Sequence, residues 1–373
     1  MHRLQLHYTL SRDASPAQVR NPLIDLLQAV SSQGSISGGA RALGLSYRHV
    51  WGELKRWENE LGSELLVWEK GQSARLTGFG NKLMWAERQA QARLAPQIEA
   101  LRAELERTFA LAFDDQVQVL TVYASHDEAI AQLREVALSQ PHEATRLHLD
   151  VRFTGSVDAI RALNEGRCVM AGFHTLEPAA RRTRSERTYK PLLRPGQHKI
   201  IGFAKRTLGL MVAPGNPLML HSLHDVASQG ARFANRALGS GTRLLLDELL
   251  DRSGLSAQDI NGYSQAEPSH ASVAQAVASG HCDTGLGIAA AARQAGLDFV
   301  PLQDERYHLV CLKSALAHPS VQKLLLLLQT AQWQTSVARI VGYAPAQSGQ
   351  VLSMRKVLPW WDFAQAKTRT TPT

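Results

Sequence analysis

Residues 35–54 have the sequence SISGGARALGLSYRHVWGEL, in which two short helical patterns are separated by a glycine. Ala40 and Leu43 fall on one face of the first pattern, and Gly44 is suited to end it in a left-handed conformation. Ser46 is suited to cap the second pattern. The inward face of that second helix contains Val50, Leu54 and Trp57. Small residues at the crossing and a glycine at the turn predict a helix-turn-helix.

The second helix of this pattern carries the side chains that we expect to contact DNA. Arginine, histidine, tyrosine and lysine side chains on one helix suit the base edges and phosphates of a major groove. The predicted DNA-binding residues of this helix are Ser46, Tyr47, Arg48, His49 and Lys55. The sequence therefore predicts a transcription regulator that binds a double-stranded DNA operator.

A β-hairpin and a long helix are predicted to follow the second helix. Residues 65–77 have a strand, a polar turn and a returning strand, a pattern typical of a wing in which Lys70 and Arg75 contact phosphates. Residues 77–109 form a helical pattern in which Pro96 predicts a kink or a break. Its narrow apolar stripe consists of Leu94, Ile98, Leu101 and Leu105. Such a stripe favours pairing with a second copy, so we expect at least a homodimer.

The composition of the chain excludes several classes of protein. The chain has 373 residues, a formal net charge of +8 and three widely spaced cysteines, which argues against a disulfide framework and a cysteine-rich metal site. The N-terminus lacks the apolar core of a signal peptide, and the longest leucine run is too short to span a membrane, so we expect a cytoplasmic protein. Residues 181–206 contain nine basic residues and one acidic residue. We interpret this segment as a solvated loop and not as a second contact with DNA.

Beyond residue 113 the pattern changes to alternating strands and helices. Apolar strands are predicted at 117–122, 147–153 and 169–173, with helices at 127–139 and 156–164 between them. A second set has strands at 208–213 and 284–286 and helices at 242–250 and 288–295. Such alternation predicts an α/β domain with a parallel sheet whose ligands bind at the carboxyl ends of the strands.

The first 110 residues resemble the DNA-binding domain of the molybdate-responsive ModE regulators. The matching sequences are GSIS at 34–37, GA at 39–40, GLSY at 44–47, Trp51 and Leu76-Thr77. The LysR-type winged helix shares Leu61-Gly62, Leu65 and Leu76-Thr77. The resemblance implies a homodimer on a palindromic operator. The paired β-barrel effector modules usual in ModE proteins have no counterpart in this sequence.

Residues from about 117 to 345 resemble a periplasmic-binding-protein-like domain found in regulators and molybdopterin biosynthesis proteins. The matching sequences include SHD at 125–127, GLMVAPGNP at 209–217, GSGTRLLLD at 239–247 and VAQAVASG at 273–280. The resemblance implies two α/β lobes joined by connections near residues 199–208 and 299–310. We therefore expect a winged helix-turn-helix domain with its long helix at 1–113, a two-lobed domain at 114–345 and a C-terminal extension at 346–373.

Hydroxyl groups at predicted helix N-termini suggest the ligand. A glycine-rich turn before a helix directs N–H groups and a positive dipole at one point, as an oxyanion requires. The predicted ligand-binding residues are Ser125, His126, Asp127, Thr154, Ser156, Arg236, Ser240, Gly241, Thr242, Arg243, Glu267, Ser269 and His270. The arrangement is similar to molybdate- and tungstate-binding proteins, in which hydroxyls and sometimes an arginine hold the oxyanion.

Two carboxylates leave the identity of the ligand undecided between an oxyanion and a molybdopterin-type compound. Asp127 and Glu267 would repel molybdate if they faced it, but they suit the hydrogen-bond donors of a molybdopterin-type compound. They would also serve as helix caps. His126, His174 and His270 are expected near the cleft, but the histidines of the chain are not spaced as metal ligands. No metal site, catalytic residue or catalytic cofactor is predicted. The alternatives are a storage protein of molybdenum metabolism, a sensor of another anionic metabolite and an enzyme acting on the bound cofactor.

Overall fold

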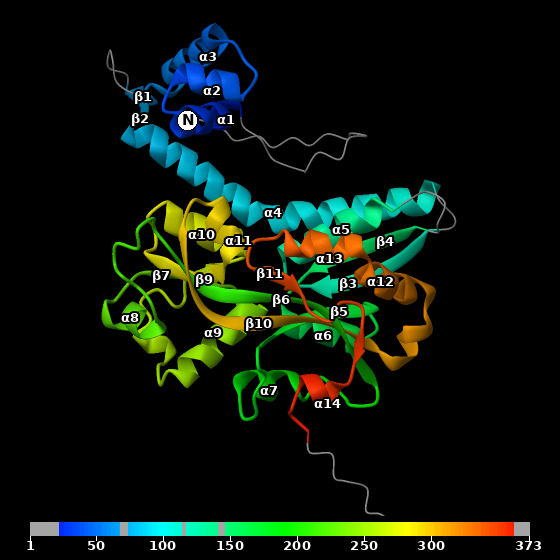
Figure 1. The fold of residues 1–373 in the computed structure, drawn as a ribbon. Helices are drawn as coiled ribbons and strands as arrows, with labels where there is room; N and C mark the ends of the chain where they lie inside the picture. Colours follow the sequence, from blue (N-terminus) through cyan, green and yellow to red (C-terminus); the bar gives the residue numbers. More distant parts are fainter. Residues whose placement is uncertain (1–21, 68–73, 114–116, 141–145, 362–373) are drawn as a thin grey trace, which may run out of the picture. The chain divides into compact units, whose positions relative to one another are not determined.

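The computed structural model describes residues 22–67, 74–113, 117–140 and 146–361 (Figure 1). The chain divides into two compact units, Met1–Glu99 and Ala100–Thr373. Residues 1–21, the tip of the wing and residues 362–373 lie outside the described residues.

The first unit is a winged helix-turn-helix, as predicted. Its elements are α1 (Pro22–Gln33), α2 (Ile36–Ala42), α3 (Tyr47–Leu61), β1 (Leu66–Val67), β2 (Arg75–Leu76) and the start of α4 (Gly78–Phe113). Ser35 caps α2 and Ser46 caps α3, each by accepting a backbone N–H three residues later. Gly39 allows α1 and α2 to cross closely, because a Cβ there would lie 2.9 Å from the backbone nitrogen of Val30.

The apolar face of α3 packs into the core of this unit. Val50 and Leu54 are buried together with Leu27 and Val30 of α1, and Trp57 packs against them. Antiparallel pairing of β1 with β2 forms the predicted hairpin. Helix α4 is continuous through Pro96, so the predicted break at that residue does not occur.

The second unit is built on one mixed sheet with the order β4-β3-β5-β10-β6-β9-β7-β8. The strands are β3 (Gln118–Ala124), β4 (Leu147–Phe153), β5 (Met170–Leu176), β6 (His198–Val212), β7 (Phe233–Arg236), β8 (Ala266–Glu267), β9 (Thr284–Ile288), β10 (Asp298–Leu312), β11 (Tyr343–Pro345) and β12 (Val351–Leu352). β11 and β12 both pair with β6. The prediction of a parallel sheet is wrong in part, because β10 runs antiparallel to β5 and β6, and β9 runs antiparallel to β6.

Helices cover both faces of this sheet (Figure 1). They are α5 (Glu128–Leu138), α6 (Ser156–Asn164), α7 (Arg184–Tyr189), α8 (Leu223–Ser228), α9 (Gly241–Arg252), α10 (His270–Ala278), α11 (Ala289–Gln294), α12 (Pro319–Gln329), α13 (Ala331–Ala338) and α14 (Met354–Val357), with 3-10 turns at Ala257–Asp259 and Lys313–Ala317. Figure 1 shows α5, α10, α11 and α13 on one side of the sheet and α6, α7, α9 and α14 on the other.

Two long strands divide the sheet into lobes. β6 and β10 are both 15 residues long and pair with each other along nearly their whole length. Lobe 1 contains β3, β4 and β5 with α5 and α6, and lobe 2 contains β7, β8 and β9 with α9 and α10. The two crossing strands, β6 and β10, contain the connections predicted near residues 199–208 and 299–310, respectively. Parallel strands within each lobe direct their carboxyl ends to the same edge, where the helix N-termini meet.

The basic segment 181–206 is not a solvated loop throughout. Residues 184–189 form α7, and residues 198–206 belong to the central strand β6. Arg206 is buried at 3% exposure, since β6 lies between β10 and β9 in the sheet. Its charge is therefore part of the interior of the domain.

Candidate functional site

The exposed face of α3 presents the predicted DNA-contacting residues. Arg48 and His49 lie in the first turn of the helix and are exposed, and neither side chain has a hydrogen-bond partner among the described residues. The Ser46 hydroxyl accepts the backbone N–H of His49 at 3.2 Å, so its structural role in this unit is that of a helix cap.

Contacts with Trp51 hold the side chains of Tyr47 and Lys55 on this face of α3. The Tyr47 ring is stacked on Trp51 at a centroid distance of 6.3 Å, and the Lys55 ammonium lies 5.1 Å from the Trp51 ring. Lys55 also forms an ion pair with Glu58 at 2.7 Å. The Glu58 carboxylate in turn accepts the backbone N–H of Leu65, which connects α3 to the wing. Lys55 is therefore held along the helix by Glu58.

The base of the wing is described and its tip is not. Arg75 lies in β2, opposite Val67, and is exposed. Lys70 lies outside the described residues. The placement of the wing relative to DNA stays a prediction.

The predicted ligand-binding residues of the second unit gather where the two lobes meet. Ser125 and Ser156 come from lobe 1, and their hydroxyl oxygens lie 3.5 Å apart. From lobe 2, Ser240 caps α9, and the Thr242 hydroxyl lies 3.3 Å from Nε2 of His270. All five of these side chains are buried. Serine and threonine hydroxyls from both lobes thus line the same interior region.

Glycines bring the two lobes into contact. A Cβ on Gly155, the N-cap of α6, would lie 2.3 Å from the carbonyl oxygen of Gly239, which precedes α9. A Cβ on Gly241 would lie 2.9 Å from the Ser156 hydroxyl and 2.7 Å from the ring of His174. The N-termini of α6 and α9 therefore approach each other, and α6 has no side-chain cap for its first N–H groups.

Buried polar atoms in this region lack partners. Nε of Arg236, Nδ1 of His174 and Nδ1 of His270 are enclosed and have no hydrogen bond among the described residues, although Nδ1 of His174 lies 3.7 Å from the Glu305 carboxylate. Arg236 is anchored through Nη1, which donates to the carbonyl of Glu267 at 3.2 Å. Because buried polar groups are normally paired, these atoms mark a place where a polar ligand would complete the hydrogen bonding.

The charges in the cleft act on one another. Burial and then the charge of Arg206 lower the pKa of Arg236 to about 9. Burial, followed by the charges of Arg236 and Arg206, holds the pKa of His270 well below its usual value, and His174 and His126 act in the same direction. An anion beside Arg236 would stabilise its positive charge, so the cleft favours negatively charged ligands.

A buried ion-pair network joins the crossing strands to lobe 1. The Arg206 guanidinium on β6 donates to Asp127 and to Glu305 on β10. Arg206 also donates to the hydroxyl of Tyr343, which itself donates to Asp127 at 2.8 Å. Asp127 additionally accepts the backbone N–H of Ala129 as the cap of α5. Its carboxylate is therefore occupied by protein groups.

The other predicted residues lie around this centre. Ser269 caps α10, and Glu267 is buried at the end of β8. Thr154 is partly buried after β4, and the ring of His126 packs on Phe153 at 4.9 Å. Arg243 is held in lobe 2, because its guanidinium lies 3.8 Å from the ring of Tyr263.

The network residues Arg206, Glu305 and Tyr343 were not singled out from the sequence as site residues. No pattern marks them, since each belongs to a strand in which polar and apolar residues alternate irregularly. Within the described residues, no group of histidine, cysteine, aspartate or glutamate side chains is arranged to hold a metal ion. No described helix is both long enough and apolar enough to cross a membrane.

Comparisons with known proteins agree with this two-part architecture. Residues 138–329 match the family model described as "PBP superfamily domain", which covers half of the chain. Residues 23–81 match "Bacterial regulatory helix-turn-helix protein, lysR family". Among solved structures, a hydrogen-peroxide-bound OxyR mutant of Corynebacterium glutamicum aligns with a TM-score of 0.44 and 17% identity, over 86% of this chain and 95% of that one.

Two curated relatives are uncharacterized bacterial proteins. YvgK of Bacillus subtilis (strain 168) is 28% identical over 201 residues, which is 54% of this chain, and the match spans 64% of the length of YvgK. A protein encoded in the 5′ region of a 2Fe-2S ferredoxin gene of Clostridium pasteurianum is 32% identical over 111 residues, which is 30% of this chain and 98% of that protein. The chain therefore belongs to the PBP superfamily, and its N-terminal helix-turn-helix is of the LysR type.

Proposed function

We propose that this protein is a ligand-responsive transcription regulator that binds operator DNA through α3 and a small anion between the lobes of its second unit. The proposal of an anion site rests on one observation. The N-termini of α6 and α9 approach each other beside the buried Arg236, whose Nε has no hydrogen-bond partner among the described residues. Helix N-termini and an arginine fork are the groups that proteins use to bind oxyanions. No catalytic residue or catalytic cofactor is assigned.

The proposed ligand is a tetrahedral oxyanion such as molybdate or tungstate. Contact between Gly155 and Gly239, and between Gly241 and Ser156, leaves the lobes close together around the cleft, which favours a small ligand over a molybdopterin-type compound. The Asp127 carboxylate is occupied by Arg206 and Tyr343, so it is not available to the hydrogen-bond donors of a pterin. Both points favour the inorganic anion.

Thermal unfolding of the purified full chain against a panel of anions tests the ligand. We expect molybdate and tungstate to raise the unfolding temperature saturably, whereas sulfate, phosphate and molybdopterin-type compounds do so less. The variant Arg236→Gln should lose this shift, and the matched exposed variant Arg293→Gln should keep it. A shift with a molybdopterin-type compound alone, or with phosphate alone, would assign the cleft to a different anion and exclude the molybdenum ligand.

Selection of duplexes from a random pool, followed by binding measurements at several salt concentrations, tests the DNA half. We expect the selected sequences to share a palindromic core and the affinity to fall steeply with salt. Arg48→Ala should weaken binding by about 1–3 kcal/mol and relax sequence preference at one position. If no sequence is enriched, the protein binds its ligand without acting on an operator, as a storage protein would.

A further inference from the structure

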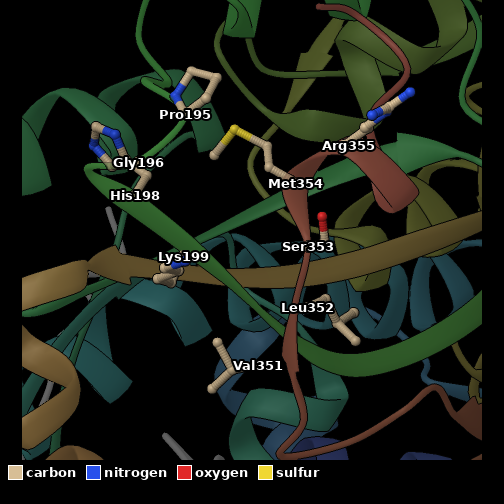
Figure 2. A pocket seen from close by; sticks show the side chains of 9 residues that line it. All are labelled: Pro195, Gly196, His198, Lys199, Val351, Leu352, Ser353, Met354 and Arg355. Atoms are coloured by element: carbon tan, nitrogen blue, oxygen red, sulfur yellow. The ribbon is translucent and has the colours of Figure 1, made fainter. Parts of the chain in front are cut away.

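A second concave surface of the PBP-like unit lies away from the cleft and is lined by cations. A cavity of about 510 Å³ is bounded by Lys199, Arg355, Ser353 and His198, together with an apolar wall. The wall consists of Pro195, Val351, Leu352 and Met354. Figure 2 shows the Met354 side chain extending from the 351–355 segment toward Pro195.

An adjoining cavity continues this surface. It measures about 520 Å³, shares Gly196 and His198 with the first cavity, and adds Arg194 and Lys313 to its lining. Neither cavity has an aspartate or glutamate among its lining residues. Four cationic side chains thus line two neighbouring hollows, and no aspartate or glutamate is among the lining residues of either. Clefts lined by charge of one sign concentrate small counter-ions.

Other basic residues of the segment 181–206 form ion pairs with carboxylates. Arg184 forms a bidentate pair with Asp251, and Lys190 pairs with Glu186. Within the basic segment 181–206, Arg194 and Lys199 have no such carboxylate partner among the described residues. Arg182 and Lys205 also have no such partner among the described residues, and of these four cations Arg194 and Lys199 line the cavities.

The walls of the first cavity are held rigidly. Nδ1 of His198 accepts the backbone N–H of Arg194 at 2.9 Å, and its Nε2 lies 2.8 Å from Oδ1 of Asn164. The opposite wall is fixed by β12, in which Val351 and Leu352 pair with β6. A site formed in advance on paired strands loses little free energy to ordering when a ligand binds.

We propose that these cavities form a second binding site, for a small phosphorylated metabolite, separate from the cleft between the lobes. Lys199 and Arg355 contact the phosphate groups, with the Ser353 hydroxyl as a further donor. The apolar wall of Pro195, Leu352 and Met354 packs against an uncharged part of the same molecule. The combination of cations with an apolar wall in a concave site fits an amphipathic small anion better than the extended backbone of DNA.

Calorimetric titration of the full-length protein with ADP, pyrophosphate and adenosine tests this site. We expect ADP to bind more tightly than pyrophosphate, and adenosine to give no saturable binding. Lys199→Gln and Arg355→Gln should each weaken ADP binding about tenfold, the loss typical of one charge-assisted contact. Lys205→Gln and Arg293→Gln remove exposed charges outside both cavities and should leave the affinity for ADP unchanged.

A second readout locates the site directly. Met354 lines the cavity, so its methyl resonance, assigned with Met354→Leu, should shift on addition of ADP. Binding that is lost in Arg236→Gln but retained in Lys199→Gln would place ADP in the cleft and overturn the proposal. Equal affinity for adenosine, equal losses in the control variants, or reduced DNA binding in Lys199→Gln with ADP binding unchanged would also overturn it.

Discussion

Gly155 controls how closely the lobes approach. Its φ of −67° suits any L-residue, so an alanine there meets no backbone strain within its own segment. The added Cβ would nevertheless lie 2.3 Å from the Gly239 carbonyl of the other lobe. Gly155→Ala should therefore weaken tungstate binding by about 1–3 kcal/mol, the usual cost of overpacking. Calorimetric titration measures this loss.

Gly52→Ala is the matched control for this prediction. A Cβ on Gly52 meets nothing within 4 Å, and the residue lies in α3 of the other unit. We expect wild-type affinity for the anion in this variant. Unaltered tungstate affinity in Gly155→Ala would mean that the ligand does not require contact between the lobes.

His308 makes the PBP-like unit sensitive to acid. Burial and then the charge of Arg306 lower the pKa of His308 to about 3, while its Nε2 lies 3.0 Å from the Thr175 hydroxyl. The unfolded chain takes up this proton near pH 6.5 and the folded chain does not, so stability present above pH 6.5 declines as the pH falls toward 3. At pH 5 the loss is about 2 kcal/mol.

His308→Gln tests this contribution, because the glutamine amide can replace the hydrogen bond to Thr175 without taking up a proton. Thermal unfolding between pH 5 and 7 should show a smaller acid-induced decrease in the variant than in the wild type. Replacement of the exposed His221 by glutamine should leave the wild-type pH dependence intact. The same dependence in all three proteins would exclude His308 as its origin.

At the scale of single residues, the sequence predicted a helix cap at Ser46 but not the roles of all serines or charges. Ser46 caps α3 as predicted, whereas Ser240 and Ser269, which were predicted as ligand-binding residues, are the N-caps of α9 and α10. Arg206 and Glu305 could not be recognised as partners, since they are 99 positions apart and meet only when β6 pairs with β10. Charged residues are rarely buried, so the pattern alone favoured solvent for Arg206.

At the scale of elements, strands with a continuous apolar pattern were predicted closely. Residues 147–153 form β4 and residues 156–164 form α6, at the predicted bounds. The first half of β6 was missed, because lysine and threonine interrupt its apolar pattern between residues 199 and 207. The antiparallel direction of β10 was also missed, since alternating strands and helices predict direction only through helical crossovers.

Helix α4 supplies the surface on which we expect dimerisation. Leu101 and Leu105 are 51% and 36% exposed, whereas Ala103 is buried and Glu106 pairs with Arg134. Each leucine covered by a second subunit is worth about 1.5–3 kcal/mol. The double variant Leu101→Glu with Leu105→Glu should therefore raise the dimer dissociation constant more than about a hundredfold.

Sedimentation equilibrium measures this change. The control is Glu104→Gln, an exposed substitution in the same turn that removes a charge without touching the leucines. We expect this control to sediment as the wild type does, and the double variant to sediment as a monomer that keeps the circular dichroism spectrum of the folded protein. A double variant that remains dimeric would show that subunits associate through another surface.

At the scale of the whole molecule, regulation requires that the anion and the DNA affect each other's binding. Such coupling between two sites is usually about 1–3 kcal/mol, or roughly 5- to 150-fold in affinity. The effect must be reciprocal: if tungstate changes the operator dissociation constant by a given factor, the operator changes the tungstate dissociation constant by the same factor. Both dissociation constants can be measured with the purified protein, the one for the operator with and without saturating tungstate and the one for tungstate with and without saturating operator.

Single-site variants separate this coupling from loss of binding. In Arg48→Ala, tungstate should bind with wild-type affinity, and the remaining DNA binding should respond to tungstate by the wild-type factor. In Gly155→Ala, operator affinity without tungstate should be normal, but the response to tungstate should shrink, because the lobes cannot come together as closely as in the structure. Equal operator affinities with and without saturating tungstate in the wild type would mean that anion binding does not regulate DNA binding.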